Sequence, residues 1–198
     1  DKRWRFSGGD GSGTFKYTNS SSSSLNEKFD HDLSGGTYAI SYFVLYEDNI
    51  FLGAGFRSIT VSGPETFSTD AVPGYYTYNH SSYGYFDLSV TVTTFRSNFF
   101  HGIYGYNYVI NDEMSLQPNL RYGYNIVLAE WNEKVDWASY TDQEVKYSES
   151  SQQFGLDIVL PFVYKINEDY SIGADICICG SSLEYTSDVE KYEFRNLN

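Results

Sequence analysis

A chain of 198 residues is long enough for one domain of ordinary size. Aromatic residues make up 19% of it, which favours strands over helices because aromatic side chains lose rotamer freedom in a helix and pack well on a pleated surface. A formal net charge of -13 argues against a nucleic-acid partner and against a protein held to anionic lipid by basic residues. No run of about 18 apolar residues is present, which excludes a transmembrane helix.

The first half of the chain shows period-two alternation of apolar and polar side chains, which predicts strands. The weaker cases are Tyr38 to Tyr46, Ile50 to Phe56 and Phe100 to Ile110. In a clearer case, Phe86, Leu88, Val90 and Val92 oppose Asp87, Ser89, Thr91 and Thr93. The stretch 83–110 is too long for one ordinary strand, so we expect a break at Arg96-Ser97-Asn98, with one bent strand as the alternative.

The second half alternates more strongly. From Ser115 to Leu128 the even positions are almost all apolar and the odd positions mostly polar, over a run longer than a typical globular strand of about 5 to 6 residues. The same rule holds from Phe154 to Ile166 and from Tyr170 to Ile178. A helix cannot produce this pattern, so these segments are predicted to be long strands.

The predicted connections are of two kinds. The segments 108–116 and 164–172 are near-repeats with Asn-Asp-Glu or Asn-Glu-Asp at their centres, and 46–50 is a shorter relative; Asn and Asp tolerate the conformations of tight turns. The remaining connections are expected to be long and polar, at 19–36, 63–82 and the acid-rich 130–151. One end of the sheet should therefore carry tight turns and the other long loops.

Two segments, Tyr104 to Leu128 and Phe154 to Ile178, combine long alternating strands with a tight turn. They resemble the strand-turn-strand units of small Gram-negative outer-membrane β-barrels, the family that includes the OmpA transmembrane domain, OmpX and OmpW. The resemblance extends from Thr37 to Gly180. It implies an all-β, antiparallel up-and-down transmembrane barrel of about 8 to 10 strands, with periplasmic turns and external loops. It also implies a place in the cell outer membrane, with membrane lipid and other envelope proteins as partners and no nucleic acid.

The resemblance and the alternation together assign residues to faces. The predicted lipid-facing residues are Leu116, Leu120, Ile126, Leu156, Ile158, Leu160, Ile172 and Ile176. The predicted aromatic girdle is Tyr104, Tyr106, Tyr108, Tyr122, Tyr124, Phe162, Tyr164 and Tyr170. The predicted polar residues of the lumen are Arg121, Asp87, Asp157 and Asp175, which would form a salt-bridged plug or a path for a polar solute.

No catalytic residue, metal site or cofactor is predicted. Cys177 and Cys179 point the same way along one strand, a poor geometry for a disulfide, and are interpreted as free thiols, with a metal or redox site as the alternative. His31 is interpreted as a solvated loop residue and His101 as an interior hydrogen-bonding residue, while His80 has no predictable partner. The glycine-rich segment 8–13 is expected to be a flexible loop or a bulge, because one copy of a calcium-repeat-like sequence is weak.

The leading functional prediction is a non-enzymatic outer-membrane barrel with a structural, surface-interaction or envelope-complex role. A small-solute channel is the second reading, and a secreted β-sandwich that binds carbohydrate through exposed residues such as Trp131 and Trp137 is the third. Residues 1–198 are taken as one barrel domain. Since 186–198 looks too charged and short for a return strand, either a closing strand is absent from the sequence or the predicted strand directions are off by one.

Overall fold

A computed structural model of the chain describes residues 1–19, 28–63, 66–67, 72–75, 83–137, 143–186 and 190–197, which are almost entirely β-strand. No helix in this part of the chain could cross a membrane. The strands are β1 (Lys2–Asn19), β2 (Lys28–Leu45), β3 (Ile50–Ser62), β4 (Thr66–Phe67), β5 (Val72–Tyr75), β6 (Tyr83–Tyr106), β7 (Tyr108–Val109), β8 (Met114–Leu116), β9 (Asn119–Trp137), β10 (Gln143–Lys165), β11 (Ser171–Ile178), β12 (Gly180–Thr186) and β13 (Glu190–Leu197).

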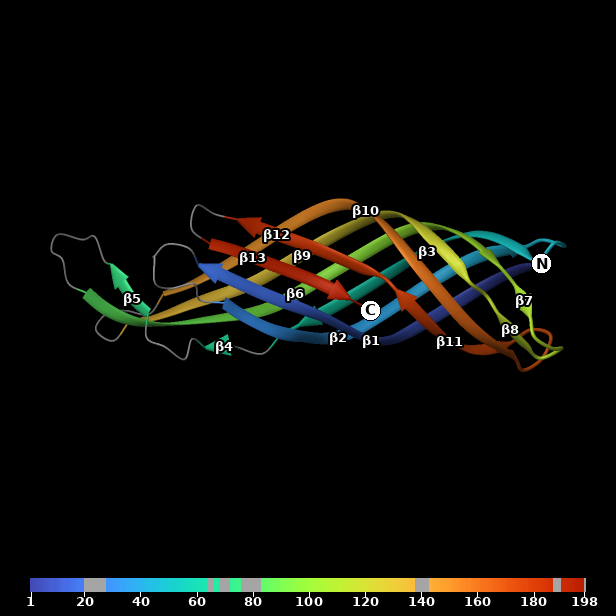
Figure 1. Ribbon diagram of the computed structural model, residues 1–198, viewed down its shortest axis with the longest axis horizontal. Coiled ribbons are helices and arrows are strands. Elements are labelled where there is room, and N and C mark those ends of the chain that lie inside the picture. The colour runs from blue at the N-terminus through green and yellow to red at the C-terminus, as the bar shows by residue number, and fades with distance from the viewer. Residues whose placement is uncertain are drawn as a thin grey trace.

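The long strands pair with their neighbours in sequence, all antiparallel, in the order β1-β2-β3-β6-β9-β10 (Figure 1). β11 pairs with β10, and Cys179 alone separates it from β12, which pairs with β13; β13 then pairs with β1. Counting β11 and β12 as one pass, the described residues make eight long passes: β1, β2, β3, β6, β9, β10, β11–β12 and β13. The predicted all-β, up-and-down barrel architecture is confirmed.

The ring of hydrogen bonds is incomplete along one stretch. Within the described residues, β11 pairs only with β10, and residues 2–12 of β1 pair only with β2. β13 covers β1 from Gly13 to Asn19. The barrel is therefore closed through β13 at one end and has facing unpaired edges at the other.

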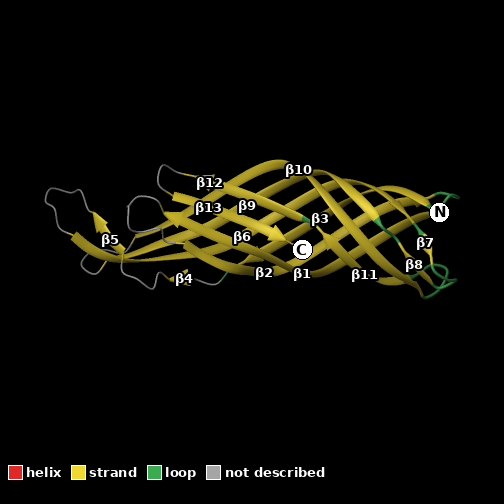
Figure 2. Ribbon diagram, viewed as in Figure 1, coloured by secondary structure: helices red, strands yellow, loops and turns green. Residues whose placement is uncertain are grey.

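The two ends are unlike, as predicted. Tight turns join β2 to β3, β7 to β8 and β10 to β11 at one end, where the N-terminus also lies (Figure 2). In the near-repeat turns, the side-chain oxygen of Asn111 accepts hydrogen bonds from the N–H groups of Glu113 and Met114 at 2.9 and 2.8 Å, and Asn167 does the same for Asp169 and Tyr170. Asn49 has a φ of 63°, the left-handed conformation that asparagine tolerates.

The expected break at Arg96-Ser97-Asn98 is wrong. β6 is one continuous strand, and its irregularity lies earlier, at a bulge between Val92 and Thr94. A bulge adds one residue to one strand, so the inward face changes from even to odd numbers at that point. Val90 and Val92 are consequently buried inside the barrel, whereas the alternation alone would have grouped them with the outer apolar face of later strands.

Three segments expected to be loops are strand. The glycine-rich segment 8–13 is the middle of β1, where Gly11 and Gly13 lie against neighbouring strands with no room for larger side chains. Most of 130–151 belongs to β9 and β10, and the charged segment 190–197 is β13. Charge argued against strands in the last two cases, but most of these charges stand on the outer face of the sheet, with Glu133 as a buried exception.

Candidate functional site: an apolar belt around a polar interior

The outer face of the barrel near the tight turns is apolar, and we call this zone the apolar belt. It is made by outward-facing residues of β1, β2, β3, β6, β9, β10 and β11. On β10 it runs from Phe154 to Tyr164. Of the predicted outward residues, Leu120, Leu156 and Ile158 are 42%, 57% and 52% exposed. Ile126, Leu160, Ile172 and Ile176 are also exposed, and Leu116 is half-buried at the turn end.

A row of aromatic rings lies along the edge of this belt that faces the loop side, and we call it the aromatic row. Phe56, Phe100, Tyr124 and Phe154 are directly opposite one another across β3, β6, β9 and β10. Ring centroids are 4.9 Å apart for Phe56 and Phe100 and 5.9 Å apart for Tyr124 and Phe154. Tyr38 of β2 extends the row, 5.9 Å from Phe56.

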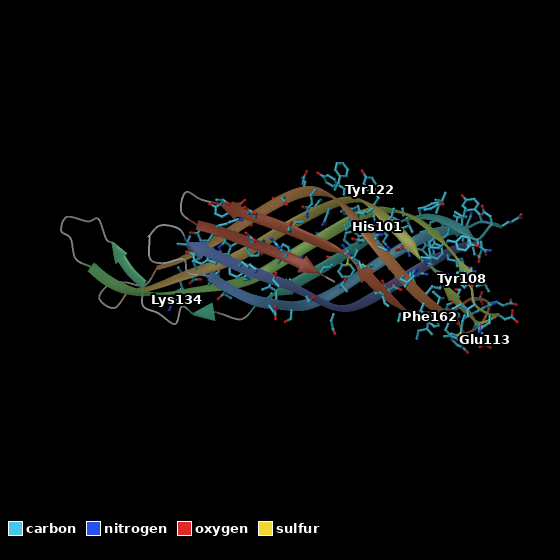
Figure 3. All side chains as sticks on the ribbon, in the orientation of Figure 1. His101, Tyr108, Glu113, Tyr122, Lys134 and Phe162 are labelled. Atoms are coloured by element: carbon cyan, nitrogen blue, oxygen red, sulfur yellow. The ribbon has the colours of Figure 1, made fainter. Side chains whose placement is uncertain are left out.

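The predicted girdle residues all lie on the outer surface. Tyr104, Tyr106, Tyr108, Phe162, Tyr164 and Tyr170 are exposed towards the turn end, and the phenol of Tyr164 donates a hydrogen bond to Glu113 at 3.1 Å. Tyr122 and Tyr124 are at the other edge of the belt, where Tyr122 stacks on Phe154 with centroids 6.0 Å apart. Figure 3 places Tyr108, Glu113 and Phe162 at the turn end and shows Tyr122 projecting from the barrel wall.

Beyond the aromatic row the outward face of the wall becomes polar, and on β9 the two faces exchange character. The outward residues of β9 after Ile126 and Leu128 are Glu130, Asn132 and Lys134, while Ala129 and Trp131 point inward and are buried. On β10 the outward face continues as Ser150, Ser148 and Lys146, and the inward residues Gln153 and Ser151 are half-buried and also polar. The barrel thus has a turn-side section with an apolar outside and a loop-side section with a polar outside.

The interior of the turn-side section is cross-linked by polar groups and also contains a small apolar cluster of Phe43, Phe51 and Ile103. Arg57 of β3 and Asp157 of β10 form an ion pair at 2.8 Å, with both side chains almost fully buried. The guanidinium of Arg121 donates to Asn119 at 3.1 Å. Further pairs are Arg5 with Gln117, Gln117 with Asn107 and Ser97 with Asn125.

The interior of the loop-side section is an apolar core. Trp131 stacks on Tyr147, with ring centroids 5.1 Å apart, and lies 5.2 Å from Phe194. The buried members are Phe15, Tyr17, Leu33, Ile59, Val61, Val90, Val92, Phe95, Val127, Ala129, Trp131, Leu183 and Phe194. Side chains from strands that are not adjacent in the sheet, such as β9 and β13, therefore meet inside the barrel.

The structure places some of the four predicted lumen residues inside the barrel and others not. Arg121 and Asp157 face inward and are buried, at 4% and 1% exposure. Asp175 is exposed on β11, although its charge interacts with those of Arg5 and Arg121. The side chain of Asp87 lies outside the described residues. The sequence analysis missed Arg57, whose alternation with Gly53, Gly55 and Ile59 on β3 is the signal that could have found it.

The other singled-out residues are placed as follows. Trp131 is fully buried, so its expected role as an exposed sugar-binding residue is wrong; the side chain of Trp137 is outside the described part. His101 faces inward, as expected, with its Nδ1 3.3 Å from the carbonyl of Phe99. His80 and the side chain of His31 are not among the described groups. Cys177 is half-buried and Cys179 is buried, and neither is in a disulfide.

Comparisons with known proteins do not assign a function to this chain. No family model and no curated protein matches the chain. The structural likenesses include the attachment invasion locus protein Ail of Yersinia pestis, with a TM-score of 0.33 and 13% identity over 97% of this chain and 93% of that one. Ail in complex with the heparin analogue sucrose octasulfate gives 0.31 and 14%, over 97% and 94%. A TodX ΔS2S3 mutant monoaromatic hydrocarbon channel gives 0.28 and 12%, over 98% and 67%. TM-scores this low do not establish a shared function.

Proposed function

We propose that this chain is an integral outer-membrane β-barrel of a Gram-negative bacterium, without enzymatic activity, that displays its loops for surface interaction or for association with other envelope proteins. The apolar belt is in contact with lipid, and the aromatic row and the turn-side tyrosines lie at the two interfaces. The loop-side section projects into water. The tight turns face the periplasm.

The exchange of faces at the aromatic row is the observation that supports this proposal most directly. A strand in lipid exposes apolar side chains outward, whereas a strand in water buries them. Both rules operate on β9, on opposite sides of the aromatic row, and the outward face of β10 changes from apolar to polar at the same level. A barrel surrounded by water throughout would leave the belt as an exposed apolar surface far larger than soluble monomers tolerate.

The height of the belt supports the same conclusion. A tilted strand crosses the hydrocarbon core in about 9 to 11 residues. The outward apolar residues of β10 extend from Phe154 to Tyr164, which matches that length. The stretch of β10 from Gln143 to Phe154 then rises roughly 30 Å above the belt when the tilt is allowed for, so the described part of the loop-side section extends beyond the bilayer surface.

The apolar core favours a display role over conduction. A solute path needs a continuous polar lumen, and Phe15, Trp131 and Phe194 are in contact in a buried apolar cluster inside the loop-side section. We therefore expect no steady conductance when the purified protein is added to planar lipid bilayers. Reproducible open-channel steps would return the small-solute channel to first place.

Ile158→Arg tests the membrane assignment, with Ser148→Arg as the matched control on the same strand and the same outward face. Ile158 lies near the middle of the apolar part of β10, where an arginine at the lipid side costs about 2 to 4 kcal/mol, whereas Ser148 already stands in water. We expect Ile158→Arg to lose most of its folded, carbonate-resistant protein in the outer-membrane fraction, and Ser148→Arg to keep it. Equal membrane assembly of both variants contradicts the proposal.

A further inference from the structure

We propose that Cys177, Cys179 and Asp157 form a binding site for a thiophilic divalent cation of the zinc type inside the barrel. This site does not depend on the membrane assignment. It uses the two thiols that the sequence analysis interpreted as free for want of a further ligand nearby. The fold supplies that ligand from another strand.

The three donor groups converge from two neighbouring strands. Asp157 is on β10, and Cys177 is on β11, opposite Val159 in the register. Cys179 occupies the short interruption between β11 and β12. The carboxylate oxygen and the two sulfur atoms all lie within 4.8 Å of one another. All three side chains point into the interior of the turn-side section.

Zinc is bound by thiolates at about 2.3 Å and by carboxylate oxygens at about 2.0 to 2.2 Å, so tetrahedral ligand atoms are less than about 4 Å apart. The observed spacing reaches that range with small side-chain rotations. Two sulfurs and one oxygen leave the fourth position to water. Two thiolates also select against magnesium and calcium, which prefer oxygen ligands alone.

Arg57 completes the arrangement as a neighbour of the ligands. Its Nη1 lies 2.8 Å from Oδ2 of Asp157 and 3.7 Å from Sγ of Cys177. The close contact with Oδ2 is poorly directed for a hydrogen bond, so this carboxylate keeps acceptor capacity although it is buried. Two thiolates, one carboxylate, a divalent cation and one guanidinium are together neutral, which suits a site removed from bulk water.

The site can be reached. Cys177 is half-buried, and the neighbouring residues of β11 are exposed on both faces beside the unpaired edge of β1. Cys179 is buried and fixes the inner side of the cluster. A cation therefore approaches along the inward face of β11, past the exposed Gly173 and Asp175, and stops where the second thiol and Asp157 meet.

Cobalt titration of the reduced, detergent-folded protein tests the proposal, because cobalt thiolates give a charge-transfer band in the near ultraviolet. We expect one equivalent of Co2+ to produce the band and Zn2+ to remove it. Cys177→Ser and Cys179→Ser should each weaken binding by at least about tenfold, and so should Asp157→Asn. Asp175→Asn is the matched control, an inward-side carboxylate on β11 outside the cluster, and should change affinity by less than about twofold.

A second measurement uses the unaltered protein and so does not depend on the folding of any variant. The chain contains only two cysteines, so alkylation counts report the site directly. Saturating Zn2+ should protect both thiols from maleimide, and Mg2+ should protect neither. Absence of both the charge-transfer band and zinc protection overturns the site, as does an effect of Asp175→Asn equal to that of Cys177→Ser.

Discussion

Arg57 of β3 and Asp157 of β10 form a buried ion pair across the barrel, although the residue directly opposite Asp157 in the β9–β10 register is Arg121. β3 and β10 are not neighbours in the sheet, since β6 and β9 lie between them. The pair therefore fastens two walls of the barrel through its interior. The guanidinium of Arg121 instead donates a hydrogen bond to the side-chain oxygen of Asn119.

Loss of one partner of this pair should be costly. We expect Arg57→Met to lower the free energy of unfolding by about 3 to 5 kcal/mol, because it leaves the carboxylate of Asp157 buried without its counter-charge. Arg96→Met is the control, since Arg96 is an exposed residue of β6. Urea unfolding in lipid vesicles measures both. A difference of less than about 1 kcal/mol between the two variants would mean that the interior is hydrated enough to replace the pair.

Truncation to alanine should lower the stability by unequal amounts at the two tryptophans whose side chains the structure describes. Trp131 is fully buried in the apolar core, whereas Trp4 is 63% exposed on the outer face. Trp131→Ala should cost about 3 to 5 kcal/mol through lost burial and a cavity, and Trp4→Ala clearly less. The same unfolding assay reports this. Equal losses would contradict the existence of a packed core on the loop side.

Adjacent glycines of β2 offer a test of how closely the strands pack. A Cβ at Gly35 would lie 2.0 Å from the carbonyl oxygen of Thr60, whereas one at Gly36 would have no neighbour nearer than 3.8 Å. Gly35→Ala should therefore cost about 1 to 3 kcal/mol or more through backbone displacement. Gly36→Ala should be neutral or stabilising by a few tenths to about 1 kcal/mol. The thermal unfolding midpoints of the two variants measure this difference. A higher midpoint for Gly35→Ala than for Gly36→Ala would mean that the β2–β3 register differs from the one described.

Acid should weaken the β12–β13 hairpin through Glu193. A hydrogen bond from Lys191, whose Nζ is 2.5 Å from Oε1 of Glu193, holds the pKa of this carboxyl below its ordinary value. A lowered folded-state pKa means that the stabilisation is present above the ordinary value near 4.5 and is lost as the pH falls through the folded-state value. The difference in unfolding midpoint between the native protein and Lys191→Met should shrink accordingly on acidification. Because Nζ of Lys191 also lies 3.1 Å from Oε1 of Glu184, the control is a background with both Glu184→Gln and Glu193→Gln, in which Lys191→Met should have no pH-dependent effect.

Much of the turn-side section could be predicted from the sequence. Period-two alternation located β9, β10 and β11, and the even-numbered residues Leu120, Leu156 and Ile158 are on the outer face as expected. The Asn111 and Asn167 turns repeat one another in structure as they do in sequence. These features are local, and local rules of side-chain alternation and turn chemistry suffice for them.

The loop-side section could not be predicted in the same way. Alternation gives two faces but does not say which one is inside, so Trp131 was assigned to the surface and the acids around Glu130 to a loop. The bulge near Thr93 moves the inward face by one residue, and no local signal in Val90 to Phe95 announces it. Arg57 was missed because its partner Asp157 comes from a strand that is not adjacent to its own.

Under the proposed membrane assignment, the exchange of faces at the aromatic row divides the molecule between two solvents. Averaged over the chain, the apolar outside of one section offsets the polar outside of the other, and the mean hydropathy of -0.42 is that of an ordinary water-exposed protein. Extraction into a medium without lipid would remove the surroundings that one section requires while leaving the other with the interior packing it already has. On that assignment the outer face of the turn-side section depends on lipid, whereas the loop-side section depends on its own packed interior.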